Sequence, residues 1–79
     1  MKGQIVCSLK GRDKGYFMVI VKEEDGYYFV CDGKERPIER PKRKNKKHLI
    51  FTDTFLDDSD CKSNKSLRKG LAVFKSRSV

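Results

Sequence analysis

The segment that is most informative about the fold spans residues 3–21 and reads GQIVCSLKGRDKGYFMVIV. A short apolar run leads into a polar turn at 11–15 with a glycine at each shoulder, and a continuous apolar run follows at 16–21. Short apolar runs bounded by such turns are typical of β-strands, and glycine permits the positive φ angles of a tight turn. We therefore predict strands at 4–9 and 16–21, the second covered on both faces at the centre of the core.

Three further strands are predicted downstream. Asp25-Gly26 is a preferred hairpin turn because both residues tolerate left-handed geometry, so the strand at 27–31 should pair antiparallel with the strand before it. A proline limits residues 36–39 to an edge strand, and β character returns at 47–52. These patterns predict an all-β chain whose five short strands form a small barrel.

The last third of the chain predicts a connector and a short helix. Residues 53–63 are polar and acidic, and we interpret them as a connector between a barrel at 1–52 and a basic amphipathic helix at 64–76. Ser63 or Asn64 would cap that helix. Its packing face is predicted from apolar side chains at helical spacing, which are Leu67, Leu71 and Phe74.

The charge balance predicts a polyanionic partner. Nineteen Lys and Arg stand against eleven Asp and Glu, a net charge of +8, while 37% hydrophobic residues remain for a single small core. In the basic segment 34–47, eight Lys and Arg stand against two Glu, so this segment carries +6 of the total. Such side chains neutralise phosphates and release condensed counterions, which favours RNA or DNA binding. A solvated surface loop or a localisation tract is the alternative interpretation.

The loops of a small barrel can converge on one side, so we expect the 11–15 turn to join the basic segment in one binding surface. Tyr16 and Tyr27 lie beside turns and are the best candidates for stacking on unpaired bases, whereas most other aromatic side chains belong in the core. The predicted RNA-binding residues are Lys10, Arg12, Lys14, Lys34, Arg36, Arg40, Lys42, Arg43, Lys44, Lys46, Lys47 and His48.

Cysteine usage predicts a reducing compartment and no metal centre. Cys7, Cys31 and Cys61 are odd in number and widely spaced, unlike a disulfide framework, and together with His48 they lack the paired spacing of a zinc site. The acidic connector lacks the spacing of a calcium loop. The N-terminal sequence has no signal-peptide core, and no apolar run reaches membrane-spanning length. We expect a cytoplasmic protein without a cofactor, a metal or a membrane partner.

Catalytic and nucleotide-binding signatures are missing from the sequence. The 11–15 turn lacks the Gly-Lys-Ser/Thr ending of a phosphate-binding P-loop, because Tyr16 follows Gly15. The one histidine, His48, has no serine, cysteine or carboxylate partner at a recognisable spacing. We expect a protein without enzymatic activity and without a small-molecule substrate.

The strand at 3–8, the glycine-bearing loop at 11–15 and the strand at 18–21 together resemble the KOW motif. The continuation, above all the run PKRKNKKHL at 41–49, is similar to the small archaeal and eukaryotic type large-subunit ribosomal proteins of the fourteen group and their bacterial relatives. This resemblance spans residues 3–52, with a weaker one at the start of the predicted helix. It implies an SH3-like barrel that uses the 11–15 loop and the basic segment against RNA, as a ribosomal or an accessory ribosome-associated protein.

We therefore predict a five-stranded SH3-like barrel of the KOW type with a short C-terminal helix, which binds structured RNA, with ribosomal RNA as the first candidate and other ribosomal proteins as further partners. Recognition should depend on shape, because A-form RNA hides its base edges in a deep, narrow groove. Two alternatives stay open. One is a protein-interaction module whose aromatic residues bind a peptide of a transcription or translation factor. The other is a duplex DNA binder.

Overall fold

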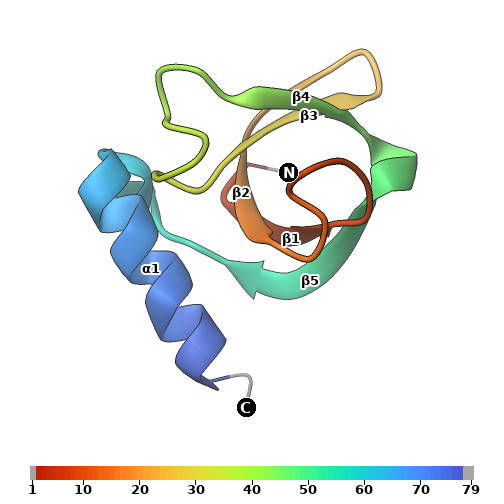
Figure 1. Ribbon diagram of the computed structural model, residues 1–79. Helices are drawn as coiled ribbons and strands as arrows, with labels where there is room; N and C mark the ends of the chain where they lie inside the picture. The colour runs from red at the N-terminus through yellow and green to blue at the C-terminus, as the bar shows by residue number, and fades with distance from the viewer. Residues whose placement is uncertain (1, 78–79) are drawn as a thin grey trace.

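The computed structural model describes residues 2–77, which form a five-stranded antiparallel sheet and a C-terminal helix (Figure 1). The mostly β fold with five strands and a final helix is thus confirmed. The elements in chain order are β1 (Gln4–Ser8), β2 (Phe17–Glu24), β3 (Tyr27–Cys31), β4 (Lys42–Asn45), the 3-10 turn η1 (Lys46–His48), β5 (Leu49–Phe55), the 3-10 turn η2 (Asp58–Cys61) and α1 (Asn64–Arg77).

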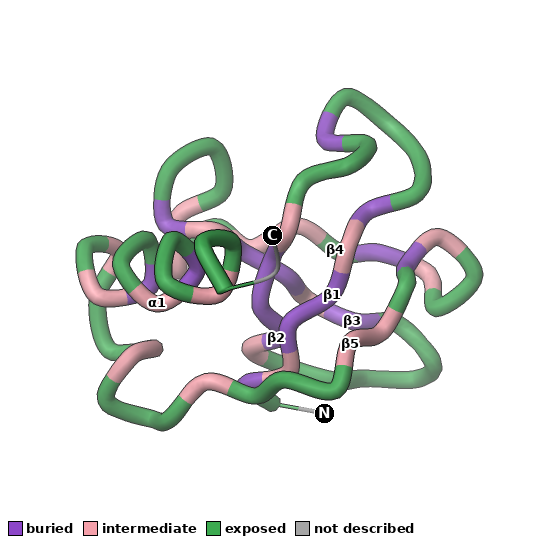
Figure 2. Tube along the Cα trace, turned by 90° about the horizontal axis from the view of Figure 1, so that it is seen from below, coloured by how far each residue is buried: buried purple, intermediate pink, exposed green. Residues whose placement is uncertain are grey.

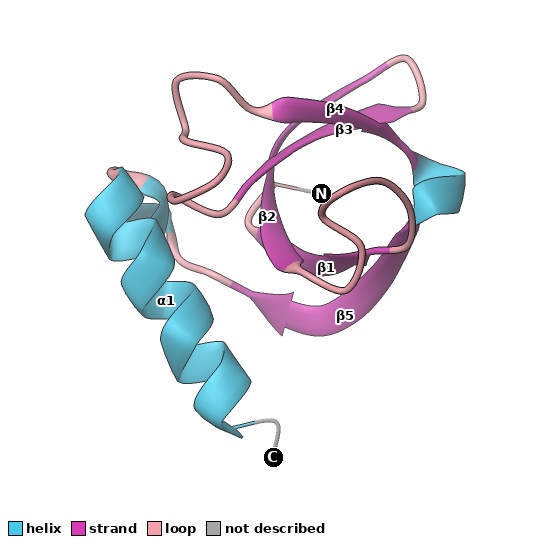
Figure 3. Cartoon of the chain, viewed as in Figure 1, coloured by secondary structure: helices cyan, strands magenta, loops and turns pink. Residues whose placement is uncertain are grey.

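The strands are ordered β4-β3-β2-β1-β5, and every neighbouring pair is antiparallel. The sheet curves strongly, so that β4 and β5, its two edges, are joined through η1 (Figure 3). The predicted hairpin turn between β2 and β3 is confirmed, since Asp25 and Gly26 both have positive φ, +49° and +80°. The β2 strand lies at the centre of the sheet, as its continuous apolar run predicts.

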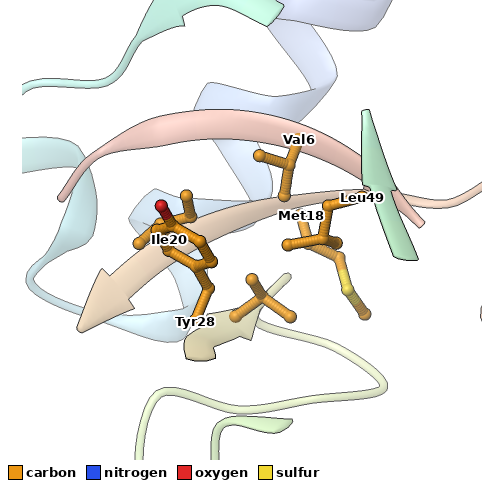
Figure 4. Close-up of a cluster of buried hydrophobic side chains, with 6 residues drawn as sticks. Val6, Met18, Ile20, Tyr28 and Leu49 are labelled. Carbon is orange, nitrogen blue, oxygen red and sulfur yellow. The ribbon is translucent and has the colours of Figure 1, made fainter. Parts of the chain in front are cut away.

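Both faces of the sheet are covered by apolar packing. On the concave face, six buried side chains from β1, β2, β3 and β5 pack together (Figure 4). On the other face, side chains that alternate with these along the strands pack against α1. The β2 residues Met18, Val19 and Ile20 are therefore fully buried, although they point to opposite faces. The first cluster comprises Val6, Met18, Ile20, Tyr28, Val30 and Leu49, and the second comprises Ile5, Val19, Cys31, Leu67 and Leu71.

Helix α1 packs on the sheet through the face that its sequence predicts. Leu67 and Leu71 are buried, and the ring of Phe74 meets Phe17 of β2 edge to face, with ring centroids 5.1 Å apart. Ser63 is the cap, because its hydroxyl accepts a hydrogen bond from the Ser66 main-chain N–H at 3.1 Å. The helix is thus fixed at its start by a cap and along its length by the second cluster.

The position of the fourth strand differs from the sequence prediction, since residues 36–39 form turns and the strand lies at 42–45, inside the charge run. The reason is that a nearby side chain binds the main-chain N–H groups that a strand would use for pairing. The Asp32 carboxylate accepts the main-chain N–H groups of Lys34 and Arg36, both at 2.9 Å, and this holds the chain in a tight turn. The strand β5 also continues to Phe55, and so includes three residues expected in the acidic connector.

Candidate functional site

The site is built around Lys44, whose ammonium group is buried. Only 6% of this residue is exposed. Its Nζ donates hydrogen bonds to the Lys10 carbonyl at 2.6 Å, to Asp13 Oδ1 at 2.7 Å and to Ser8 Oγ at 2.8 Å. All three donor positions of the ammonium group are therefore used within the protein. Lys44 thereby fastens the loop at 11–15, which joins β1 and β2, to the edge strand β4.

Asp13 is the anionic partner in this arrangement. Its Oδ1 accepts from both Lys44 and the Ser8 hydroxyl, and its Oδ2 lies 3.4 Å from Lys42 Nζ. Burial by itself raises the pKa of Asp13, but the hydrogen bonds from Lys44 and Ser8 and the charges of Lys44 and Lys42 outweigh it and hold that pKa below its ordinary value. The carboxylate is therefore ionised at neutral pH and balances a lysine charge.

Main-chain hydrogen bonds give the loop a defined shape. The Gly15 N–H donates to the Ser8 carbonyl at 2.8 Å, and the Tyr16 N–H donates to the Asp13 carbonyl at 2.9 Å. Gly11 and Gly15 have φ angles of +91° and +86°, which confirms the positive φ predicted at both shoulders. The side chains at 10, 12 and 14 remain exposed. A buried carboxylate thus anchors the loop while three cationic side chains project from it.

Two other segments, η1 and the β3–β4 connection, adjoin this loop. The Leu9 N–H donates to the His48 carbonyl at 2.8 Å, which places η1 beside the start of the loop. The residues Gly15 and Tyr16 at its end share a hollow with Lys34. Figure 2 shows the β1–β2 loop and the β3–β4 connection rising from the same side of the sheet. The predicted convergence of the two basic regions is therefore observed.

The predicted cationic residues fall into three groups by exposure. Lys44 is buried and makes its contacts inside the protein. Lys42 and His48 are half-buried, and Lys42 faces Asp13. The exposed residues are Lys10, Arg12, Lys14, Lys34, Arg36, Arg40, Arg43, Lys46 and Lys47. We refer to these nine, together with Lys42, as the basic surface, which extends around the β4 edge of the sheet, because Arg43 alternates with Lys42 and Lys44 and lies over the ring of Tyr27.

The two tyrosines singled out from the sequence lie in different surroundings. Tyr16 is 50% exposed at the end of the 11–15 loop. Tyr27 is 37% exposed, and the guanidinium group of Arg43 lies over its ring, 4.7 Å from the centroid. Arg43 therefore already occupies one face of the Tyr27 ring, whereas Tyr16 lines a hollow.

Sequence reasoning missed Ser8 and Asp13 as parts of the site. A signal for them appears only once β4 is known to be a strand, because Lys42 and Lys44 then pair with Val30 and Tyr28 of β3 and so point to the concave face. Two lysines directed toward a core need a buried anion. Asp13 is the acidic residue in the facing loop. Its contacts with Lys42 and Lys44 form only when the sheet is assembled, with β1 packed against β5 and β3 against β4.

A second surface feature is an apolar groove of about 580 Å³ between the end of β5 and α1. Phe55 and Val73, which are 47% and 45% exposed, contribute to its lining. Gly70 keeps the helix close to the groove floor, since a Cβ there would lie 3.0 Å from Leu56. Lys69 and Arg77 also line the groove, together with Asp60.

Residues 2–77 contain no group of three or more His, Cys, Asp or Glu side chains arranged to hold a metal ion. Cys7, Cys31 and Cys61 are free thiols, and burial raises the pKa of Cys31 to about 12. Within the same described range, no helix is long and apolar enough to span a membrane.

The sequence was also compared with known proteins. No family model matches the chain, and no curated protein is significantly similar to it.

Proposed function

We propose that this chain is a non-enzymatic RNA-binding protein that recognises structured RNA, with ribosomal RNA as the first candidate, through phosphate contacts on its basic surface. The observation that carries the proposal is the fastening of the 11–15 loop by Lys44 and Asp13. This contact brings two basic segments that are remote in sequence to one side of the sheet. The excess charge of the chain is thereby concentrated on a surface of fixed shape.

A fixed arrangement of cations suits a rigid polyanion. RNA helices present two phosphate strands at defined separations, and their base edges are hidden in a deep, narrow groove. A protein that binds them through Lys and Arg reads the spacing of phosphates. Exposed cations on the 11–15 loop, on η1 and around the 32–36 turn provide such a spaced set.

The strand arrangement supports the family resemblance. A curved five-stranded antiparallel sheet, with a glycine loop between β1 and β2 and a 3-10 turn between β4 and β5, has the elements that an SH3-like barrel of the KOW type would have. We propose that the chain is a member of this group and serves as a ribosomal or ribosome-associated component. The buried Lys44–Asp13 pair would then be this chain's means of holding its KOW loop in place.

Nucleic acid carried through purification tests the proposal directly. The purified full chain should show excess absorbance at 260 nm that RNase removes and DNase leaves. In competition, a structured RNA hairpin should displace a labelled hairpin more effectively than a DNA duplex of the same sequence. A preference for the DNA duplex would instead establish the duplex DNA alternative.

Peptide binding is the second candidate function, and the groove between β5 and α1 is the observation that favours it. Its exposed Phe55 and Val73 would accept apolar side chains, and Lys69 and Arg77 would favour an acidic residue in the same peptide. We assign this groove to an extended, apolar and acidic peptide of a protein partner. Val73→Glu should abolish such binding and leave RNA affinity unchanged, whereas substitutions on the basic surface should do the reverse.

A further inference from the structure

A hollow of about 370 Å³ lies beside the basic surface, where the start of β2, the turn after β3 and helix α1 meet. Its volume is within the range of small-molecule binding sites. Tyr16 is half exposed and contributes its ring to the lining. The complete lining is Gly15, Tyr16, Phe17, Asp32, Lys34, Glu35 and Lys75.

The walls of this hollow are held in place by other contacts. Both main-chain groups of Tyr16 are bonded, its N–H to the Asp13 carbonyl at 2.9 Å and its carbonyl to the Ser8 N–H at 3.0 Å. On the opposite wall, Arg68 Nη1 donates to the Gly33 carbonyl at 2.6 Å. A Cβ at Gly33 would lie 2.5 Å from the Asn64 carbonyl oxygen, so this turn sits directly against α1. The hollow is therefore formed before any ligand arrives.

The side chains around the hollow differ in how far the protein already uses them. The Asp32 carboxylate shapes its own turn by accepting two main-chain N–H groups. Among residues 2–77, no hydrogen bond or ion pair engages the side chain of Lys34 or of Glu35. The hollow thus offers an aromatic face, an available carboxylate and the Lys34 ammonium group, whereas Lys75, which also lines it, already has a partner.

We propose that this hollow binds one unpaired guanine of a structured RNA. In this arrangement the base stacks on Tyr16, the Glu35 carboxylate accepts hydrogen bonds from its Watson–Crick edge, and Lys34 faces a flanking phosphate. Stacking on an aromatic side chain with hydrogen bonds to the base edge is the usual way in which proteins read unpaired RNA bases. The inference rests on the proposed RNA binding and narrows the ligand to a helix interrupted by an unpaired guanine.

The choice of guanine follows from the carboxylate. Guanine presents two adjacent donors, N1–H and the N2 amino group, which match the two oxygens of one carboxylate. Adenine and cytosine place an acceptor beside their single amino donor, and uracil places acceptors on both sides of its N3–H. Each of these bases would set a lone pair against the Glu35 carboxylate, and only guanine avoids that repulsion.

Three hairpin RNAs with the same stem test the proposal on the purified full chain. One is fully paired, one carries a single bulged guanine and one carries a single bulged uracil. The guanine-bulged hairpin should bind about five- to a hundred-fold more tightly than the paired hairpin. Tyr16→Leu should remove most of this gain without changing affinity for the paired hairpin. Glu35→Gln should remove the preference for guanine over uracil.

Tyr27→Leu is the matched control, because Tyr27 is also an exposed tyrosine beside a turn but lies outside the hollow. It should leave the guanine preference unchanged. Equal binding of all three hairpins by the wild-type chain would overturn the inference and leave the proposed function standing. Binding of none of them would overturn the proposed function itself. The wild-type comparison decides the matter even if Tyr16→Leu melts at a lower temperature.

Discussion

Lys44 is the residue whose role differs most from the role that its position suggests. It lies in a run of lysines and arginines, and by type and context it is indistinguishable there from Lys46 and Lys47. The structure buries it against Asp13, whereas Lys46 and Lys47 are exposed. We therefore assign Lys44 a positioning role. The cations that contact RNA in our proposal are its exposed neighbours.

Replacing Lys44 with methionine tests this division of roles. Lys44→Met leaves the buried Asp13 carboxylate without its main partner, which should lower the free energy of unfolding by about 3 kcal/mol. Amide hydrogen exchange in the 11–15 loop should accelerate. Lys46→Met, the matched control, removes an exposed charge and should leave the melting temperature unchanged while weakening RNA binding. Equal melting temperatures for the two variants would contradict the assignment.

The stability contributed by Asp13 should depend on pH. Its pKa is lower in the folded chain than in the unfolded chain, so the contribution is present above the unfolded value, near 3.8, and is lost as the pH falls through the folded value. Asp13→Asn, which carries no titratable group there, should therefore be less stable than wild type at pH 7. The difference should shrink below about pH 4. Urea unfolding measures this difference in stability. A difference that is constant from pH 7 to pH 2 would show that ionisation of Asp13 does not contribute to the stability of the fold.

Among the elements, the β1–β2 loop combines two functions that substitutions can separate. Gly15 has a φ of +86° with no atom within 4 Å of an added Cβ, so a substitution there is opposed by backbone conformation and not by crowding. Gly15→Val should destabilise the fold by about 2 kcal/mol. Gly15→Asn, the control, should cost less because asparagine adopts left-handed geometry more readily. Thermal unfolding of the two variants checks this order, and equal losses would contradict it.

The double variant Arg12→Ala, Lys14→Ala addresses the second function of the same loop. Both side chains are exposed and project from the loop without anchoring it. The melting temperature should stay at the wild-type value, and affinity for a structured RNA hairpin should fall. An early melting transition with normal affinity would reverse the roles that we give to the loop's backbone and side chains.

The sequence predicts the elements whose signals are local. The apolar runs of β2 and β3, the Asp25-Gly26 turn and the helical spacing of Leu67 and Leu71 each identify an element from its own residues. The strand at 42–45 could not be predicted, because its sequence, Lys-Arg-Lys-Asn, has no apolar residue. Only the pairing with β3 and the ion pairs to Asp13 make it a strand, and both are contacts with distant segments.

At the scale of the whole molecule, the sequence likewise predicts only those parts of the candidate site whose signals are local. The exposed cations could be predicted from charge density, since exposure is the default state of Lys and Arg. The placement of the 11–15 loop beside the basic segment could be expected only in outline, because it depends on Asp13 meeting Lys44 across 31 positions of sequence. The hollow beside Tyr16 depends on three segments, β2, the turn after β3 and α1, and no single stretch of sequence carries its signal.

The molecule also has a basic surface and an apolar groove to which we give separate roles. A triple variant removes three of the exposed charges by combining Arg43→Ala, Lys46→Ala and Lys47→Ala. It keeps Lys42 and Lys44, which hold Asp13. This triple variant should fold normally and bind RNA more weakly. A matched triple alanine variant of exposed cations in and just before α1, at Lys62, Lys65 and Lys69, should bind RNA with nearly wild-type affinity, since none of these residues belongs to the basic surface.

The salt dependence of RNA affinity tests the central claim most directly. If the basic surface neutralises about five to eight phosphates, the plot of log K against log salt for a structured hairpin should have a slope of about −4 to −7. The triple variant of Arg43, Lys46 and Lys47 should reduce the magnitude of that slope by about two to three, because each lost phosphate contact removes somewhat less than one. A slope near zero, or a slope unchanged in the triple variant, would contradict phosphate recognition by this surface.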